Sequence, residues 1–128
     1  MKSVEEMEVF KLAHELAQEI YKVSVSFPKE ERFNLVSQMR RAASSVGMNL
    51  VEGSMRLNSR EFRQLVGIAR GSAAEVSYQL LLAKDLGYIK KEVYDELYSE
   101  YERVSQVPTH LAQSLARRES SFLYDHEP

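Results

Sequence analysis

The stretch QMRRAASSVGMNLVEGSMR, from Gln38 to Arg56, decides the fold class of this chain. Its apolar residues recur at the spacing of an α-helix, and many of the residues beside them are alanine, serine or glycine. Small side chains allow two helix backbones to approach each other closely. The stretch therefore predicts a helix that packs tightly against other helices.

The residues on the N-terminal side of this stretch predict a first helix and the start of a second. The first helix is expected to begin at the capping-box sequence Ser3-Val4-Glu5-Glu6 and to end at Phe27-Pro28, because a residue before proline avoids the α conformation. The second helix is expected from about Lys29 to Glu52, with Gly53 as the first residue beyond its end.

The residues on the C-terminal side predict two more helices. Asn58 is a good N-cap for the third, which is expected to stop at Gly87. The fourth is expected from about Lys90, with a kink or a break at Pro108. The apolar stripes of the four helices include Met7, Phe10, Ile20 and Tyr21, then Phe33, Met39, Val46 and Leu50, then Phe62, Val66, Ile68 and Leu80, and finally Leu97, Tyr101, Val104, Leu111 and Leu115.

Four helices of roughly 20 to 28 residues joined by short turns predict an all-α, up-down-up-down antiparallel four-helix bundle. A chain of 128 residues has room for one domain of this kind. We expect the bundle to cover residues 1–116. Residues 117–128 show no apolar period, and we expect them to form a flexible tail.

The composition limits where the protein works and what it binds. The chain has no cysteine, which excludes disulfides and thiolate metal sites and suits the reducing cytoplasm. It also lacks a secretory signal and any apolar stretch of about 20 residues, so we expect a soluble cytoplasmic protein that does not enter a membrane.

The sequence contains no motif that predicts catalysis. It has no cysteine nucleophile, phosphate-binding P-loop or Glu-x-x-His metal pair. His14 and His110 would meet if the first and last helices were neighbours, but no carboxylate stands at ligand spacing beside both. We therefore predict no catalytic residue, no metal and no cofactor.

Charge is distributed unevenly along the chain. The segment from Arg32 to Arg70 contains seven arginines, no lysine and two glutamates, a charge of +5, which leaves -7 for the rest of a chain whose net charge is -2. Arginine is well suited to phosphate, and arginines near a helix N-terminus attract anions further. The predicted nucleic-acid-binding residues are Arg40, Arg56, Arg60 and Arg63. The alternative is an ordinary solvated charged surface.

Polar residues form a second pattern, at spacings of 3, 4, 4 and 3 along the second helix and on the facing side of the third. We predict an internal polar network, with an ion pair between Arg41 and Glu75, that fixes the register of the two helices. Two alternatives stay open: a ligand cavity at Arg41, Asn49 and Glu75, or an interface between subunits. The residues concerned are Gln38, Arg41, Ser45, Asn49 and Glu52 with Ser72 and Glu75.

Two longer segments carry a family resemblance. The sequences FPKEERFNLVSQMRRAASSVGMNLVEG and IARGSAAEVSYQLLLAKDLGYI resemble the small four-helix proteins encoded in intervening sequences of bacterial 23S ribosomal RNA genes. They are also similar to the accessory variability protein of diversity-generating retroelements. The resemblance covers residues from about 4 to 115, and Gly47 stands where the family often has proline. It implies a ring-like homopentamer that binds nucleic acid or a nucleic-acid enzyme.

Two functional hypotheses follow. The first is a non-enzymatic oligomer associated with RNA or DNA. In this hypothesis, charge reversal at Arg56, Arg60 and Arg63 would abolish the binding of nucleic acid. The second is an assembly scaffold that docks a protein and ignores nucleic acid. Tyr94, Tyr98 and Tyr101, at spacings of 4 and 3, are expected either in the core or at a subunit interface.

Overall fold

The structure, a computed structural model, describes residues 4–56 and 58–106. It contains α1 (Val4–Ser24), a short 3-10 helix η1 (Lys29–Glu31), α2 (Leu35–Ser54), α3 (Ser59–Asp85) and a fourth helix over residues 91–106. Within these ranges there is no strand, and no helix is long and apolar enough to cross a membrane. The capping box at Ser3, the kink at Pro108, Leu111, Leu115, His110 and the boundary at residue 116 lie outside the described residues.

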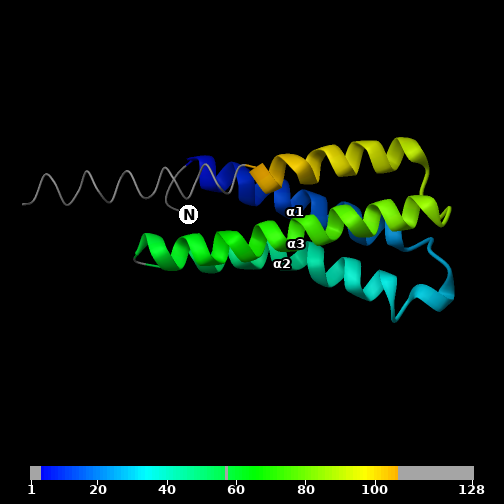
Figure 1. The fold of residues 1–128 in the computed structure, drawn as a ribbon, viewed down its shortest axis with the longest axis horizontal. Coiled ribbons are helices and arrows are strands. Elements are labelled where there is room, and N and C mark those ends of the chain that lie inside the picture. Colours follow the sequence, from blue (N-terminus) through cyan, green and yellow to red (C-terminus); the bar gives the residue numbers. More distant parts are fainter. Residues whose placement is uncertain (1–3, 57, 107–128) are drawn as a thin grey trace, which may run out of the picture.

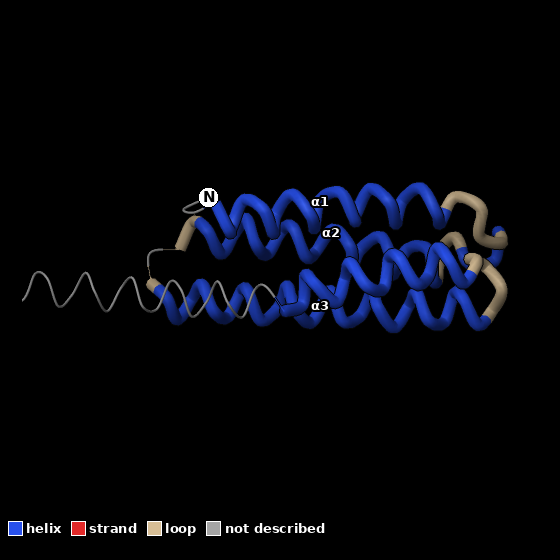
Figure 2. Tube along the Cα trace, turned by 90° about the horizontal axis from the view of Figure 1, so that it is seen from above, coloured by secondary structure: helices blue, strands red, loops and turns tan. Residues whose placement is uncertain are grey.

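The four helices lie side by side and alternate in direction, so the prediction of an up-down-up-down bundle is confirmed (Figures 1 and 2). α2 packs against both α1 and α3. The fourth helix packs on α3, where the Arg70 Nε–H donates a hydrogen bond to the Ser105 carbonyl at 2.9 Å. Each helix therefore contacts the helix that precedes it in the chain.

All four helices contribute to a single hydrophobic core. Its largest fully buried side chains are Tyr101, Phe62, Ile20, Met39 and Leu80. Each such side chain contributes about 1.5–3 kcal/mol by its burial. Buried alanines on α1, α2 and α3 fill the space between them: Ala13, Ala42, Ala43, Ala69, Ala73 and Ala83. Ala42, Ala43, Gly53 and Ser54 of the opening stretch are thus buried between helices, as predicted, whereas Ser44, Ser45 and Gly47 are only half-buried.

The two ends of α3 are formed as the sequence predicts. The Asn58 side chain accepts a hydrogen bond from the Glu61 backbone N–H at 2.9 Å, which makes Asn58 the N-cap. At the other end Gly87 has a φ of +81°, and the Tyr88 N–H donates to the Ala83 carbonyl at 2.8 Å. This arrangement is the Schellman C-cap, in which glycine adopts the left-handed conformation at little cost.

The connection between α1 and α2 differs from the prediction. α1 ends at Ser24, before Phe27, and the second long helix begins at Leu35 rather than Lys29. The backbone of Asn34 is not helical, with φ -126° and ψ -100°, and it separates the short 3-10 helix from α2. The Asn34 side chain bonds to the side chains of Glu31 and Gln38 at 3.2 Å each.

Several expected core positions are also wrong. Phe33, on the turn before α2, is 88% exposed, and Met7, Tyr21 and Ile68 are exposed as well. Gly53 is not beyond the end of α2 but inside it, buried against Phe62 and Leu65 of α3. Apolar periodicity marks a face of each helix, but it does not show how far the neighbouring helices cover that face.

Candidate functional site

Arg40 holds the end of α1 in place. Its Nε–H donates to the Ser24 Oγ at 3.0 Å, and its Nη2 donates to the Tyr21 carbonyl at 3.2 Å. Its Cζ lies 4.8 Å from the centroid of the Tyr21 ring. The Tyr21 carbonyl is among the last of α1, where carbonyls lack a backbone partner within the helix, and it also accepts a bond from the Ser24 hydroxyl. Arg40 is half-buried rather than fully exposed, and part of its guanidinium group is used in these structural contacts. Its predicted role in binding nucleic acid stays a prediction.

Arg56, Arg60 and Arg63 lie at the opposite end of α2, around the turn to α3. Arg56 forms an ion pair with Glu52 at 2.7 Å. Arg60 and Arg63 are exposed on the first turns of α3 and have no carboxylate within 4.0 Å among the described residues. The helical rise along α2 separates Arg40 from Arg56 by roughly 24 Å. The four predicted arginines therefore do not form one cluster.

The predicted polar network is formed in part. The hydroxyls of Ser45 and Ser72 are 2.9 Å apart across the α2–α3 contact. The Asn49 Nδ2 donates to the Ser45 Oγ at 3.0 Å and to the Ser45 carbonyl at 2.8 Å. These three residues are half-buried and join the two helices at one level of the bundle. Whether this connection has a function beyond register stays a prediction.

The other predicted members lie outside this group. Gln38 bonds to Asn34 and Glu52 to Arg56, each on the surface. Arg41 and Glu75 are both exposed and form no ion pair with each other, so the predicted pair is wrong. Their charged groups stay in water, which avoids the desolvation cost of a buried pair.

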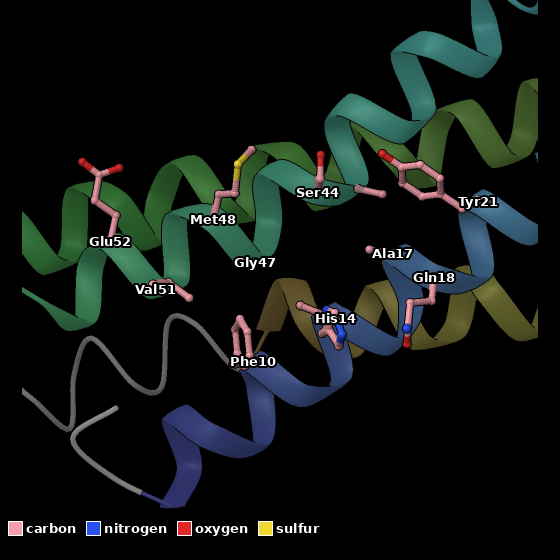
Figure 3. A pocket seen from close by; sticks show the side chains of 12 residues that line it. Phe10, His14, Ala17, Gln18, Tyr21, Ser44, Gly47, Met48, Val51 and Glu52 are labelled. Carbon is pink, nitrogen blue, oxygen red and sulfur yellow. The ribbon is translucent and has the colours of Figure 1, made fainter.

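An apolar groove runs between α1 and α2 on the outside of the bundle (Figure 3). It has a volume of about 670 Å³. Phe10 and Tyr21 of α1 and Met48 and Val51 of α2 line it, and Gly47 forms part of its floor. The sequence analysis assigned Phe10 and Tyr21 to the core and missed this groove. The signal for it was the run of small residues on both facing helices: Ala13, Ala17, Ala43, Ser44 and Gly47.

Two basic cavities lie at the other end of the α1–α2 pair, beside η1. One, of about 280 Å³, is lined by Lys29, Arg32 and Arg40 among others. The second, of about 440 Å³, shares Arg32 and Arg40 and adds Arg41 and Phe33. Among the residues that the structure describes, no acidic side chain lines either cavity. The sequence did not reveal this site, because Phe33 fits an apolar stripe and Arg40 was grouped with the distant arginines of α3.

The tyrosines of the fourth helix divide between core and surface. Tyr101 is fully buried, and burial raises the pKa of its hydroxyl above the usual value. Tyr98 is exposed and its ring lies 5.3 Å from that of Tyr94. Lys84 of α3 lies 4.6 Å from the Tyr94 centroid, a cation–π contact that joins the two helices. Tyr101 therefore belongs to the core, whereas Tyr98 faces solvent.

The described residues contain no group of three histidine, aspartate or glutamate side chains placed to hold a metal ion. His14 lies on α1, where its ring stacks on Phe10 with centroids 6.0 Å apart. Its predicted neighbour His110 is outside the described residues. The absence of a metal or a cofactor thus stays a prediction.

Comparison with known proteins agrees with this architecture. The crystal structure of a protein of unknown function from the S23 ribosomal protein family of Bacteroides thetaiotaomicron VPI-5482 superposes with a TM-score of 0.76. It is 24% identical and covers 86% of this chain and 99% of its own, so the likeness concerns the fold. A search of curated proteins gives no match.

The family assignment rests on a broader match. A family model described as 23S rRNA-intervening sequence protein matches residues 5–110, which include every helix of the bundle. The likeness to the retroelement accessory protein stays a prediction. The chain belongs to the 23S rRNA-intervening sequence protein family.

Proposed function

We propose that this chain is a non-enzymatic, cytoplasmic protein that associates with nucleic acid through its arginines. One observation carries the proposal. Of the seven arginines from Arg32 to Arg70, only Arg56 has a carboxylate within 4.0 Å among the described residues. No ion pair within the described residues compensates the other six, although the protein as a whole is slightly acidic.

Four of the other described cations, Lys22, Lys84, Lys91 and Arg103, each form an ion pair with a glutamate or aspartate at 2.8 to 3.5 Å, whereas Lys11, Lys29 and Lys90 form none. Acidic side chains are thus placed beside cations in α1, at the end of α3 and in the fourth helix. Within the described residues, no such partner lies beside Arg41, Arg60 or Arg63. A surface of this kind favours phosphate, which planar guanidinium groups bind in a bidentate manner.

The test is a fluorescence-anisotropy titration of the purified protein with structured RNA and with duplex DNA, at about 50 and 200 mM salt. We expect binding that weakens steeply with salt, because released counterions drive phosphate contacts. The double variant Arg60→Glu/Arg63→Glu is expected to bind less tightly, while the matched variant Arg103→Glu, in the ion-paired part of the surface, is expected to bind as the wild type. No binding at the lower salt concentration would remove the proposal.

The apolar groove favours a second candidate function, an assembly scaffold built from copies of this chain. Met48 and Val51 are exposed in the groove, and Tyr21 and Phe10 face them from α1. A contiguous apolar surface of this kind is typical of a protein–protein contact. We propose that a second copy covers it, in the homopentamer that the family resemblance implies.

Light scattering coupled to gel filtration tests this assembly. Met48→Lys introduces a charge into the groove, whereas Met55→Lys makes the same change on α2 outside the residues that line it. We expect the first variant to have a lower molar mass than the wild type and the second to keep the wild-type mass. A monomeric wild type, or equal masses for both variants, would contradict the assignment of the groove.

A further inference from the structure

We propose that the two basic cavities beside η1 bind an unpaired nucleotide of a single-stranded nucleic acid, with its base stacked on Phe33 and its phosphate held by Arg32 and Arg41. This inference rests on the proposed association with nucleic acid and adds the site and the strandedness of the ligand. Bases and phosphates are common to RNA and DNA, so the inference covers both.

Phe33 is the first part of the site. Its side chain is 88% exposed, the highest fraction among the large apolar residues of the described chain. The Cζ of Arg32 lies 5.4 Å from its ring centroid and so occupies one side of the ring. Most of the ring surface still faces water. A solvated phenylalanine contributes nothing to the core and offers a face on which a base can stack.

The turn that carries Phe33 is fixed by hydrogen bonds on both sides. The Glu31 carboxylate accepts one bond from the Asn34 Nδ2 at 3.2 Å and one from the Tyr88 hydroxyl at 3.0 Å. The Asn34 Oδ1 in turn accepts a bond from Gln38 of α2. The aromatic ring is therefore presented from an ordered turn, which lowers the entropy lost on binding.

The charges around Phe33 form the second part of the site. Arg32, Arg40 and Arg41 line the same cavity as Phe33, and Lys29 lines the cavity next to it. None of these four has a carboxylate within 4.0 Å among the described residues. Of the two acids of η1, Glu31 accepts bonds from Asn34 and Tyr88, and Glu30 is exposed and lines neither cavity.

Arg40 gives this site a fixed cation. Its Nε–H donates a hydrogen bond to Ser24, and its Nη2 donates one to Tyr21. The remaining N–H groups of its guanidinium are available in the two cavities that Arg40 lines. A guanidinium held in this way has already lost its side-chain freedom. Tyr21, half-exposed beneath it, supplies a second aromatic ring in the same cavity.

The combination of aromatic rings and arginines favours an unpaired strand over a duplex. In a duplex the base faces are stacked on one another and are not accessible to Phe33, and only phosphates and groove edges remain. Single-strand sites combine a positive groove with exposed aromatic rings on which bases stack. An acidic peptide would use the arginines alone and would leave Phe33 without a role.

The experiment compares binding of fluorescein-labelled oligomers to the full-length protein and two single variants. The oligomers are an unstructured RNA, a DNA of the same sequence, and the duplex of that DNA. Phe33→Ala removes the stacking ring, and Tyr78→Ala removes another exposed aromatic ring, on α3, that lines neither cavity. Both residues are exposed, so neither change disturbs the core. Phe33→Trp restores an aromatic face at the same position.

We expect Phe33→Ala to weaken binding of both single strands by roughly 5- to 150-fold and to leave duplex binding unchanged. Tyr78→Ala and Phe33→Trp are expected to bind as the wild type. The double variant Arg32→Glu/Arg41→Glu is expected to weaken single-strand binding and to reduce its dependence on salt.

The outcomes separate this inference from the proposed function. If the wild type binds nucleic acid but Phe33→Ala binds single strands equally well, the inference is wrong and the proposed function stands. Equal losses for single strands and duplex would also overturn the inference, because they exclude stacking on an unpaired base. If no oligomer binds at about 50 mM salt, both proposals fail together.

Discussion

Replacing Arg40 by methionine separates its structural contacts from any role in binding. The substitution keeps the unbranched apolar stem but removes the hydrogen bonds to the Ser24 Oγ and the Tyr21 carbonyl, together with the contact with the Tyr21 ring. Hydrogen bonds to charged groups contribute about 1.5–3 kcal/mol when buried. These two are partly exposed, so we assign about 1 kcal/mol to each, and about 0.5–1 kcal/mol to the cation–π contact. The expected loss is about 2–3 kcal/mol of the free energy of unfolding.

Urea unfolding followed by circular dichroism, at one fixed protein concentration, measures this loss. The matched control is Arg41→Met, because Arg41 is the next residue of α2, is exposed, and its side chain makes no hydrogen bond or ion pair within the described chain. The control is expected to change the free energy of unfolding by less than about 0.5 kcal/mol. A cycle that combines Arg40→Met with Tyr21→Leu isolates the cation–π contact, with an expected coupling of about 0.5–1 kcal/mol.

Equal stabilities of the Arg40 and Arg41 variants would refute this reasoning. The end of α1 would then be held by other contacts, and Arg40 would be as available to a ligand as its neighbour. A large loss for Arg40→Met with an unchanged m-value would support a local clamp, because the surface exposed on unfolding would be the same.

Three other predictions concern the helix ends and the core. Asn58→Ala removes the bond to the Glu61 N–H and is expected to cost about 1 kcal/mol in thermal or urea unfolding, whereas Asn58→Ser retains most of the stability. Gly87→Ala should destabilise the protein by about 1–2 kcal/mol, because the φ of Gly87 is +81°. Gly71→Ala lies on an exposed helical site with open space around it and should stabilise the protein by up to about 1 kcal/mol. Equal effects of the two substitutions would contradict the assigned backbone conformations. Burial raises the pKa of the Tyr101 hydroxyl in the folded state above its usual value, so its contribution to stability is complete at lower pH and decreases as the pH rises above about 10. In unfolding curves measured at neutral and high pH, Tyr101→Phe should reduce the loss of stability at high pH. An unchanged pH dependence would contradict this role of the Tyr101 hydroxyl.

Periodicity and end signals were sufficient to predict the number, order and direction of the helices. Asn58 and Gly87 mark the ends of α3. Asn58 caps the helix with its own side chain and Gly87 ends it with its own backbone conformation, so both ends can be predicted from local residue types. The connection at residues 29–34 was harder. The Glu31 carboxylate there accepts hydrogen bonds from the Asn34 Nδ2 and from the hydroxyl of Tyr88, which is distant in sequence, and no local pattern shows the second of these.

The candidate sites depended even more on contacts between distant residues. Arg40 was expected to face solvent with the other candidate arginines, yet its partners lie on the preceding helix. Phe33 fits an apolar stripe that would require α2 to begin several residues earlier than it does. The predicted pair of Arg41 and Glu75 assumed that facing helices turn these side chains inward, whereas both are exposed.

The order in which the helices pack has a consequence for how the protein forms during synthesis. α1 packs on α2 and α2 on α3, so each hairpin can close as soon as its second helix has left the ribosome. The fourth helix supplies Leu97, Tyr101 and Val104, the last buried residues of the core in the described chain. Until those residues emerge, nascent chains carry an open apolar face on the first three helices, which makes that interval the time of greatest need for a chaperone.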